Sequence, residues 1–171
     1  MHLPLLQPGF IGNDWLGYFH LICSACSFSF LALWGPAFIE RSADVCKAAE
    51  YIVLSKSFDY GSAPSAEQCV VVDAAVEKEA RDAFRRCGAF FMTQAEAAAL
   101  GALLFHSNGR RRRDLVAVDA PTLARRAGFQ APGATVLVAD RRFVSEADSY
   151  NRELIAPILP WYVEDDWRQI G

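Results

Sequence analysis

"KSFDYGSAPSAEQCVVVD", residues 56–73, joins a loop rich in small residues to a run of apolar, mostly β-branched residues. A continuous apolar run of this length is typical of a strand that is buried on both faces. Along the rest of the chain, short apolar runs alternate with longer stretches of helical periodicity. This alternation predicts βαβ units, and therefore an α/β fold with an open, mostly parallel sheet and helices on both faces.

The predicted helices begin at residues that favour helix N-termini. Ser42 is expected to cap the first helix, Thr93 forms a capping box with Glu96, and Asp119 precedes a helix with a proline near its start. His106 is expected at the end of a helix, where a cation meets the negative pole of the helix dipole. The expected helices cover residues 43–56, 75–87, 94–106 and about 120–128.

The predicted strands are short apolar segments bounded by turn residues. They cover residues 37–40, 68–72, 89–92, 134–140 and 157–163. The last of them contains Pro160, which lacks a backbone N–H, so this strand is expected at an edge of the sheet or with a bulge.

The bulk composition fits one globular domain with a substantial core. The chain has 171 residues, of which 53% are hydrophobic and 22% charged, and its net charge is −3. This balance does not favour a nucleic acid or an anionic membrane as a partner. Five cysteines at irregular spacing favour a reducing compartment, so a cytoplasmic location is expected.

One short stretch departs from this balance, the four arginines at residues 110–113. A short charge run of this kind predicts a solvated loop. A phosphate-binding or nucleic-acid-binding role is the alternative. The absence of aromatic residues interleaved with the arginines disfavours it, and no nucleic-acid partner is predicted.

Residues 1–34 differ in character from the rest of the chain. Residues 15–34 hold no charged residue over a length that could span a membrane, but they include several polar residues and lack a basic flank. We interpret residues 1–34 as an apolar leader that is either non-native or membrane-associated, with membrane association the less favoured. Cys23 and Cys26 form a C-x-x-C pair with His20 three residues before it, but zinc would need a fourth ligand at useful spacing, so no metal site is predicted.

The remaining motifs resemble one family. The segments "ERSAD" at 40–44, "SKSFD" at 55–59 and "SAEQ" at 65–68 match in order, without a gap, the CoA-acylating branch of the aldehyde dehydrogenase superfamily. The similarity extends over about residues 35–168, which identifies residues 35–171 as part of an aldehyde dehydrogenase catalytic domain. The resemblance implies an oxidoreductase that converts an aldehyde to an acyl-CoA, with NAD and CoA as cofactors.

The resemblance also assigns two site positions. The family's nucleophilic cysteine falls on Pro64, and the glutamate that contacts the nicotinamide-side ribose of NAD falls on Glu153. Proline offers no nucleophile for the covalent step. It also lacks the backbone N–H that family members use at this turn to hold the developing oxyanion.

Three functional hypotheses follow from this substitution. The first is a truncated, catalytically inactive relative, because the cofactor-binding half of the family is also unmatched; binding of NAD and CoA by this chain is then doubtful. The second is a non-catalytic interaction module that associates with an intact homologue or with copies of itself. The third is an active enzyme that uses Cys69, which is disfavoured because Cys69 lies five residues further on in a buried strand.

Overall fold

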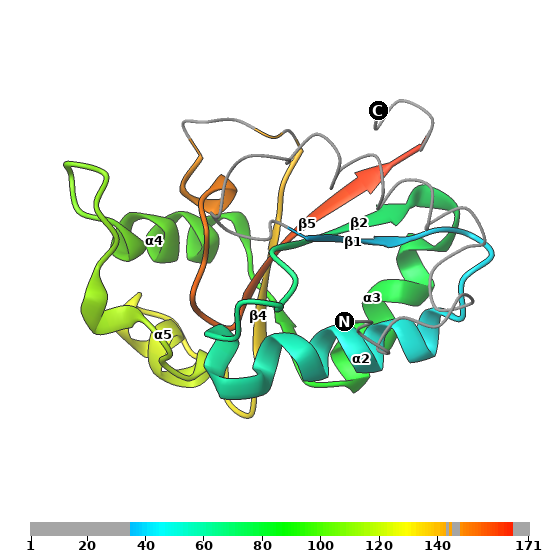
Figure 1. Cartoon of the computed structure of the whole chain (residues 1–171), viewed down its shortest axis with the longest axis horizontal. Helices are drawn as coiled ribbons and strands as arrows, with labels where there is room; N and C mark the ends of the chain where they lie inside the picture. The colour runs from blue at the N-terminus through cyan, green and yellow to red at the C-terminus, as the bar shows by residue number, and fades with distance from the viewer. Residues whose placement is uncertain (1–34, 143, 145–147, 166–171) are drawn as a thin grey trace, which may run out of the picture.

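The computed structural model describes residues 35–142, 144 and 148–165. These residues form a five-stranded sheet with helices on both faces (Figure 1). The strand order is β1-β2-β5-β4-β3 and every pairing is parallel, so the predicted α/β fold is confirmed. The strands are β1 (Pro36–Ile39), β2 (Cys69–Asp73), β3 (Ala89–Phe91), β4 (Val136–Asp140) and β5 (Ile158–Glu164). The α-helices are α2 (Val45–Ser57), α3 (Glu77–Arg86), α4 (Gln94–Leu104) and α5 (Ala120–Arg126).

One apolar core lies on each face of the sheet. Helices α2 and α3 pack on one face and α4 and α5 on the other. Strand β5 contributes to both cores, because Leu159 and Trp161 belong to the first and Ile158 to the second. The Trp161 ring makes edge-to-face contacts with Phe84 at 5.0 Å and Phe91 at 5.2 Å between ring centroids. Burial on both faces explains why the strands are continuous apolar runs.

Two of the predicted caps are confirmed and one is wrong. Thr93 forms the capping box with Glu96 at the start of α4, and Asp119 accepts a hydrogen bond from the Thr122 amide at the start of α5. At α2 the cap is Asp44, whose carboxylate accepts from the Lys47 amide at 3.1 Å. The amide and the hydroxyl of Ser42 both donate to the Glu40 carboxylate instead, so the Ser42 side chain does not cap the helix.

The prediction that a helix ends at His106 is wrong. Helix α4 ends at Leu104, and Phe105 pairs with Arg111 in an isolated antiparallel bridge. The His106 amide donates to the carbonyl of Arg110 at 2.8 Å. Residues 105–111 therefore form a short hairpin that projects beyond α4 (Figure 1).

The prediction that Pro160 marks an edge strand or a bulge is also wrong. Strand β5 is the central strand, paired with β2 on one side and β4 on the other, and Pro160 lies in regular register with Ala139. Burial in both cores outweighs the one ladder hydrogen bond that a proline cannot donate.

No α-helix in residues 35–142 or 148–165 is both long and apolar enough to cross a bilayer. The apolar run at residues 15–34, for which membrane association was the less favoured interpretation, lies outside the described residues.

Candidate functional site

Pro64 lies in the loop between α2 and β2, at residues 58–68, which we call the α2–β2 loop. The amide of Ala66 donates to the carbonyl of Ala63 at 3.0 Å, which closes a turn with Pro64 in its second position. The fixed φ of proline suits this position. The side chain is exposed. The turn thus tolerates proline in its backbone while offering neither a nucleophile nor an N–H at residue 64.

The α2–β2 loop is held against the segment that precedes β5. Gly61 has a φ of +74°, and a Cβ there would lie 2.3 Å from the carbonyl oxygen of Ala156, so only glycine fits. The side chain of Gln68 accepts a hydrogen bond from the Leu154 amide at 3.1 Å and donates to the Ala66 carbonyl at 3.2 Å. These contacts join the turn that carries Pro64 to the segment that carries Glu153.

Lys56, at the end of α2, supplies a third connection. Its side chain is fully buried, and its ammonium group donates to the carbonyl of Leu154 at 3.2 Å. Burial lowers the pKa of Lys56 to about 8, against the opposing influence of Glu67, Cys69 and Glu153. The lysine therefore holds a buried positive charge beneath the loop at neutral pH.

Glu67 is the acidic neighbour of this lysine. Burial raises the pKa of its carboxyl group, while a hydrogen bond from the Ser55 side chain and the charge of Lys56 act in the opposite direction. Its Oε2 atom is buried and has no hydrogen-bond partner among the described residues. The neighbouring Gln68 has a structural role, because its side chain binds backbone groups of the loop and of the segment before β5.

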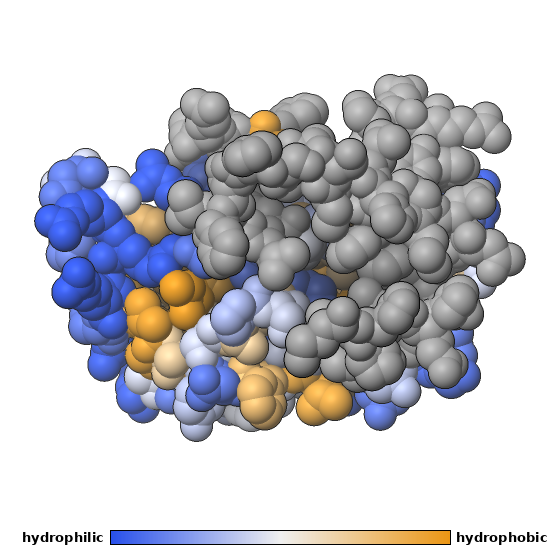
Figure 2. All heavy atoms as spheres, in the orientation of Figure 1, coloured by the Kyte–Doolittle hydropathy of each residue, from blue (hydrophilic) through white to orange (hydrophobic). Residues whose placement is uncertain are grey.

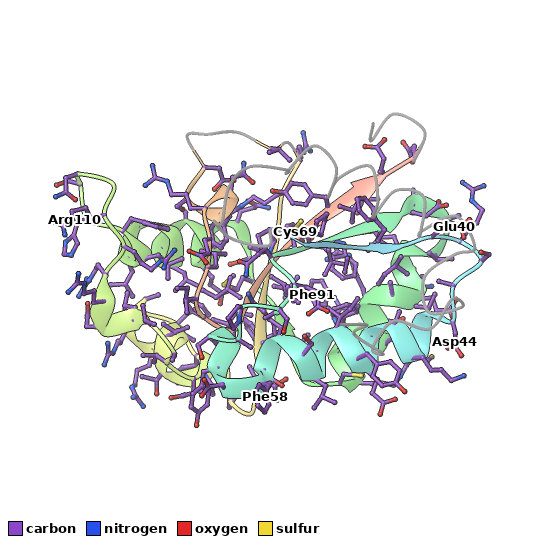
Figure 3. The ribbon with its side chains drawn as sticks, viewed as in Figure 1. Glu40, Asp44, Phe58, Cys69, Phe91 and Arg110 are labelled. Atoms are coloured by element: carbon purple, nitrogen blue, oxygen red, sulfur yellow. The ribbon has the colours of Figure 1, made fainter. Side chains whose placement is uncertain are left out.

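Cys69, the candidate substitute nucleophile, begins β2 and is half-buried; Figure 3 labels it at the start of the strand. Burial raises the pKa of its thiol to about 11, although the charge of Lys56 opposes this shift. A thiol with this pKa is almost entirely protonated at neutral pH and is a poor nucleophile.

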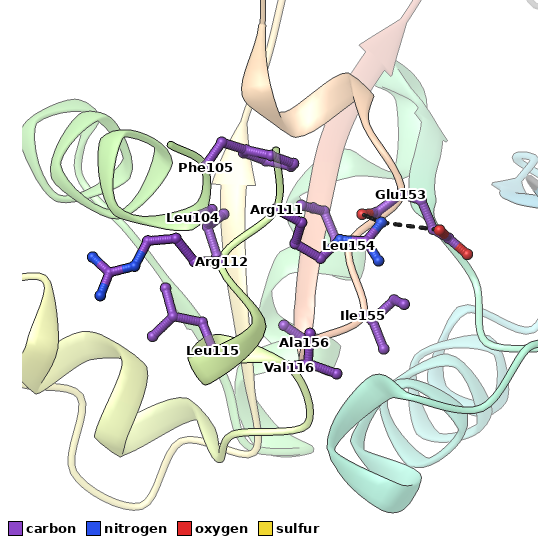
Figure 4. Close-up of a pocket in the computed structure, with 10 residues that line it drawn as sticks. All are labelled: Leu104, Phe105, Arg111, Arg112, Leu115, Val116, Glu153, Leu154, Ile155 and Ala156. Carbon is purple, nitrogen blue, oxygen red and sulfur yellow. Dashed lines mark hydrogen bonds and ion pairs between the residues drawn. The ribbon is translucent and has the colours of Figure 1, made fainter. Parts of the chain in front are cut away.

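Glu153, the predicted cofactor contact, lies at the rim of a small pocket (Figure 4). Its carboxylate Oε2 is 2.9 Å from Nη2 of Arg111, and the same nitrogen donates to the Glu153 carbonyl at 2.7 Å. The Glu153 side chain is 41% exposed, and its Oε1 atom has no partner among the described residues. Apolar side chains also line the pocket, those of Leu104, Leu115, Val116, Ile155 and Ala156.

Pro64 and Glu153, the two positions assigned by resemblance, thus lie on segments that are joined through the backbone of Leu154. Sequence reasoning missed the parts that connect them, Lys56 and Gly61. A signal for Lys56 was present, because it continues the buried positions of α2 at helical spacing after Ile52 and Val53. No local signal showed that Gly61 would pack on a segment almost a hundred residues away.

Comparison with known proteins shows which proteins share the sequence and the fold of this chain. The chain is 32% identical over 133 residues to the aldehyde-alcohol dehydrogenase of Streptococcus pneumoniae, matching 72% of this chain. It superimposes with a TM-score of 0.78 on a probable aldehyde dehydrogenase from Listeria monocytogenes, at 37% identity over 81% of this chain. An acetylating aldehyde dehydrogenase from Geobacillus thermoglucosidasius gives the same TM-score at 26% identity and 87% coverage. The chain is a relative of the acylating aldehyde dehydrogenases.

The match covers part of each relative. It spans 15% of the Streptococcus protein, 31% of the Listeria chain and 34% of the Geobacillus chain. No protein-family model matches the chain. A propionaldehyde dehydrogenase from Rhodopseudomonas palustris shares the fold, with a TM-score of 0.73 at 22% identity, and that protein holds CoA and an acylated cysteine.

Proposed function

We propose that this domain has kept the frame of an acylating aldehyde dehydrogenase active-site loop and has lost the covalent step of the reaction. The family reaction joins an aldehyde to a cysteine thiol, passes hydride to NAD and transfers the acyl group to CoA. Pro64 carries the proposal, because residue 64 has neither a thiol nor an amide hydrogen. The raised thiol pKa of Cys69 supports it, since the nearest cysteine is poorly suited to substitute.

Glu153 is the position at which this chain would contact NAD. The residue fits such a contact in part, because Oε1 is free to accept a ribose hydroxyl while Oε2 is ion-paired with Arg111. NAD would supply the hydride acceptor. The chain's own contribution at this point is one carboxylate oxygen, fixed in place by the arginine.

Restoring the thiol tests the proposal. Pro64→Cys is made together with Cys69→Ala, and acyl transfer from p-nitrophenyl acetate is followed by intact mass and peptide mapping, which require no NAD. We expect the wild-type chain to gain no acetyl group at residues 58–73, and the variant to gain one at position 64.

Ser65→Cys in the same Cys69→Ala background is the matched control, because Ser65 is the exposed neighbour of Pro64 in the same turn. A preserved frame should make position 64 react at least about tenfold faster than position 65, since placement of the reacting group sets the rate. Equal rates would show that the frame has been lost as well. Acetylation of Cys69 in the wild-type chain would overturn the proposal directly.

A second candidate function is association with an intact homologue. Its support is a group of exposed apolar side chains on the outer surface of α2 and the turn that follows, formed by Tyr51, Leu54, Phe58 and Tyr60. Figure 2 shows apolar surface along this edge of the molecule. Co-expression with a full-length acylating aldehyde dehydrogenase should give a complex that Leu54→Glu weakens and Lys47→Glu, one turn outside the patch, does not. Absence of a complex would remove this function and leave the first proposal untouched.

A further inference from the structure

One end of the molecule carries a concentration of arginine that the sequence alone does not reveal. We call it the arginine lobe and define it as residues 105–126 together with Arg152 and Glu153. It contains seven arginines and three carboxylates, a formal charge of +4, whereas the rest of the chain has ten basic and seventeen acidic residues. Figure 2 shows strongly hydrophilic side chains gathered at this end, and Figure 3 places Arg110 there, opposite Glu40.

Two of the seven arginines hold the lobe together. Arg111 binds the backbone and carboxylate of Glu153. Arg152 donates to the carbonyl of Gly109 at 2.8 Å, and its guanidinium carbon lies 5.0 Å from the centroid of the Phe105 ring. These contacts fix the hairpin of residues 105–111 against the segment before β5.

The other five arginines remain on the surface. Arg112 and Arg126 share the carboxylate of Asp114, at 2.9 Å and 3.6 Å, which leaves an excess of one positive charge. The exposed Arg125 side chain donates to the Thr122 hydroxyl. The guanidinium groups of Arg110 and Arg113 make no ion pair with any residue that the structure describes.

We infer that the arginine lobe binds the phosphate backbone of a nucleic-acid duplex without reading its sequence. Guanidinium groups match phosphate oxygens in a forked geometry, and all seven basic residues here are arginine rather than lysine. The Arg111–Glu153 ion pair and Arg112 line the neighbouring pocket. Arg110, Arg113, Arg125 and Arg126 are exposed and do not line this pocket, which suits an extended polyanion rather than a small ligand.

The other side chains of the lobe disfavour two further kinds of partner, a lipid bilayer and a single-stranded nucleic acid. The described residues include six large apolar side chains that are exposed, and none lies in the lobe, so it has nothing to insert into a bilayer. Of Phe, Tyr and Trp the lobe contains only Phe105, and the Arg152 guanidinium lies against that ring, which disfavours stacking on an unpaired base. Contact with the phosphate backbone of a duplex requires neither apolar side chains that insert into a bilayer nor aromatic rings that stack on bases.

The experiment is a titration of the full chain into a fluorescein-labelled DNA duplex of arbitrary sequence, followed by anisotropy as the salt concentration is varied. Five phosphate contacts predict a slope of about −4.5 for log K against log salt, or about 500-fold weaker binding between about 50 and 200 mM salt. Arg110→Ala with Arg113→Ala should reduce the magnitude of the slope by about 2.

Arg85→Ala with Arg86→Ala is the matched control, since it removes the same charge from the last turn of α3, outside the lobe. Circular dichroism melting confirms that each variant folds. Selective loss of binding in the lobe variant supports the inference. No binding at about 50 mM salt, an equal loss in the control, or binding to phosphatidylserine vesicles without binding to the duplex would overturn it.

Discussion

The α2–β2 loop and the hairpin of the arginine lobe, residues 105–111, both contact the segment before β5, residues 152–157, but they do so in different ways. The loop uses a glycine with no space for a side chain and a buried glutamine, and the buried Lys56 at the end of α2 adds a third contact. The lobe uses ion pairs and hydrogen bonds between partly exposed groups. Buried polar contacts are costly to break, whereas exposed ion pairs contribute little to stability.

Because of this difference, the two regions contribute differently to the stability of the domain. The loop makes contacts that stabilise the fold although Pro64 offers no nucleophile, so its conformation has a structural value independent of catalysis. The lobe has more arginines than take part in the contacts that stabilise it. Its charge is therefore better explained by a partner at the surface than by the stability of the domain.

The largest effect is expected at Gly61. In Gly61→Ala the new Cβ would lie 2.3 Å from the Ala156 carbonyl oxygen, and the residue would keep a φ of +74°. Steric overlap and left-handed backbone strain together should lower the free energy of unfolding by about 3 kcal/mol. Urea unfolding followed by circular dichroism measures this change.

Gly128→Ala separates the effect of steric overlap from that of backbone strain. Gly128 also has a positive φ, +92°, but a Cβ there meets nothing within 4 Å. It should cost only the backbone strain, about 1 kcal/mol. If the two variants lose the same stability, the close packing of the loop on residues 156–157 contributes nothing.

Gln68→Ala should have the next largest effect. It leaves the buried amide of Leu154 and the carbonyl of Ala66 without the partners that the glutamine side chain supplies. Unsatisfied buried groups of this kind should lower the free energy of unfolding by about 2 kcal/mol. Gln94→Ala, at an exposed position in the first turn of α4, is the control and should change stability little. A loss below about 0.5 kcal/mol for Gln68→Ala would mean that water replaces the side chain easily.

Lys56 should make stability depend on pH. Its pKa is lowered from 10.5 to about 8 in the folded chain, so the unfolded state binds more protons above pH 8 and the free energy of unfolding rises with pH. The pKa of Cys69, raised from 9.0 to about 11, acts in the opposite sense above pH 9. The clearest window is therefore pH 8 to 9, in which stability should rise by about 1 kcal/mol.

Lys56→Met removes this titration, and Lys47→Met, at an exposed lysine of the same helix, is the control. Urea unfolding at pH 8 and pH 9 should show the rise in the wild-type chain and in Lys47→Met, and a flat profile in Lys56→Met. A rise that persists in Lys56→Met would assign the dependence to another group.

The sequence predicted the fold because each element carried its own local signal. The apolar run of β2, the capping box of Thr93 and the Asp119 cap all agree with the structure. The failures came where a distant contact outweighed a local preference. Pro160 lies in the central strand because both cores bury its neighbours, and residues 105–111 turn into a hairpin because Arg111 and Arg152 hold them to the segment before β5.

The candidate site was predictable only in part for the same reason. Pro64 and Glu153 were found by their place in family motifs, whereas the contacts of Gly61 and Lys56 with residues 154–157 depend on the tertiary fold. The arginine lobe was underestimated, because the sequence shows one run of four arginines. The fold adds Arg125, Arg126 and Arg152 from other segments, as the contacts of Arg126 with Asp114 and of Arg152 with Gly109 show.

The smallest effect is expected for Glu153→Gln, which removes the charge of the Arg111 ion pair while keeping an acceptor for the guanidinium group. Both side chains are partly exposed, 30% for Arg111 and 41% for Glu153, so water and salt screen their attraction. The free energy of unfolding should fall by about 0.5 kcal/mol, and less at high salt. Asp73→Asn provides the contrast, because the Asp73 side chain is 4% exposed and pairs with Arg41, so its loss should cost more. If Glu153→Gln destabilised the domain by more than about 2 kcal/mol, the lobe would be as structural as the loop, and its arginines would need no partner to explain them.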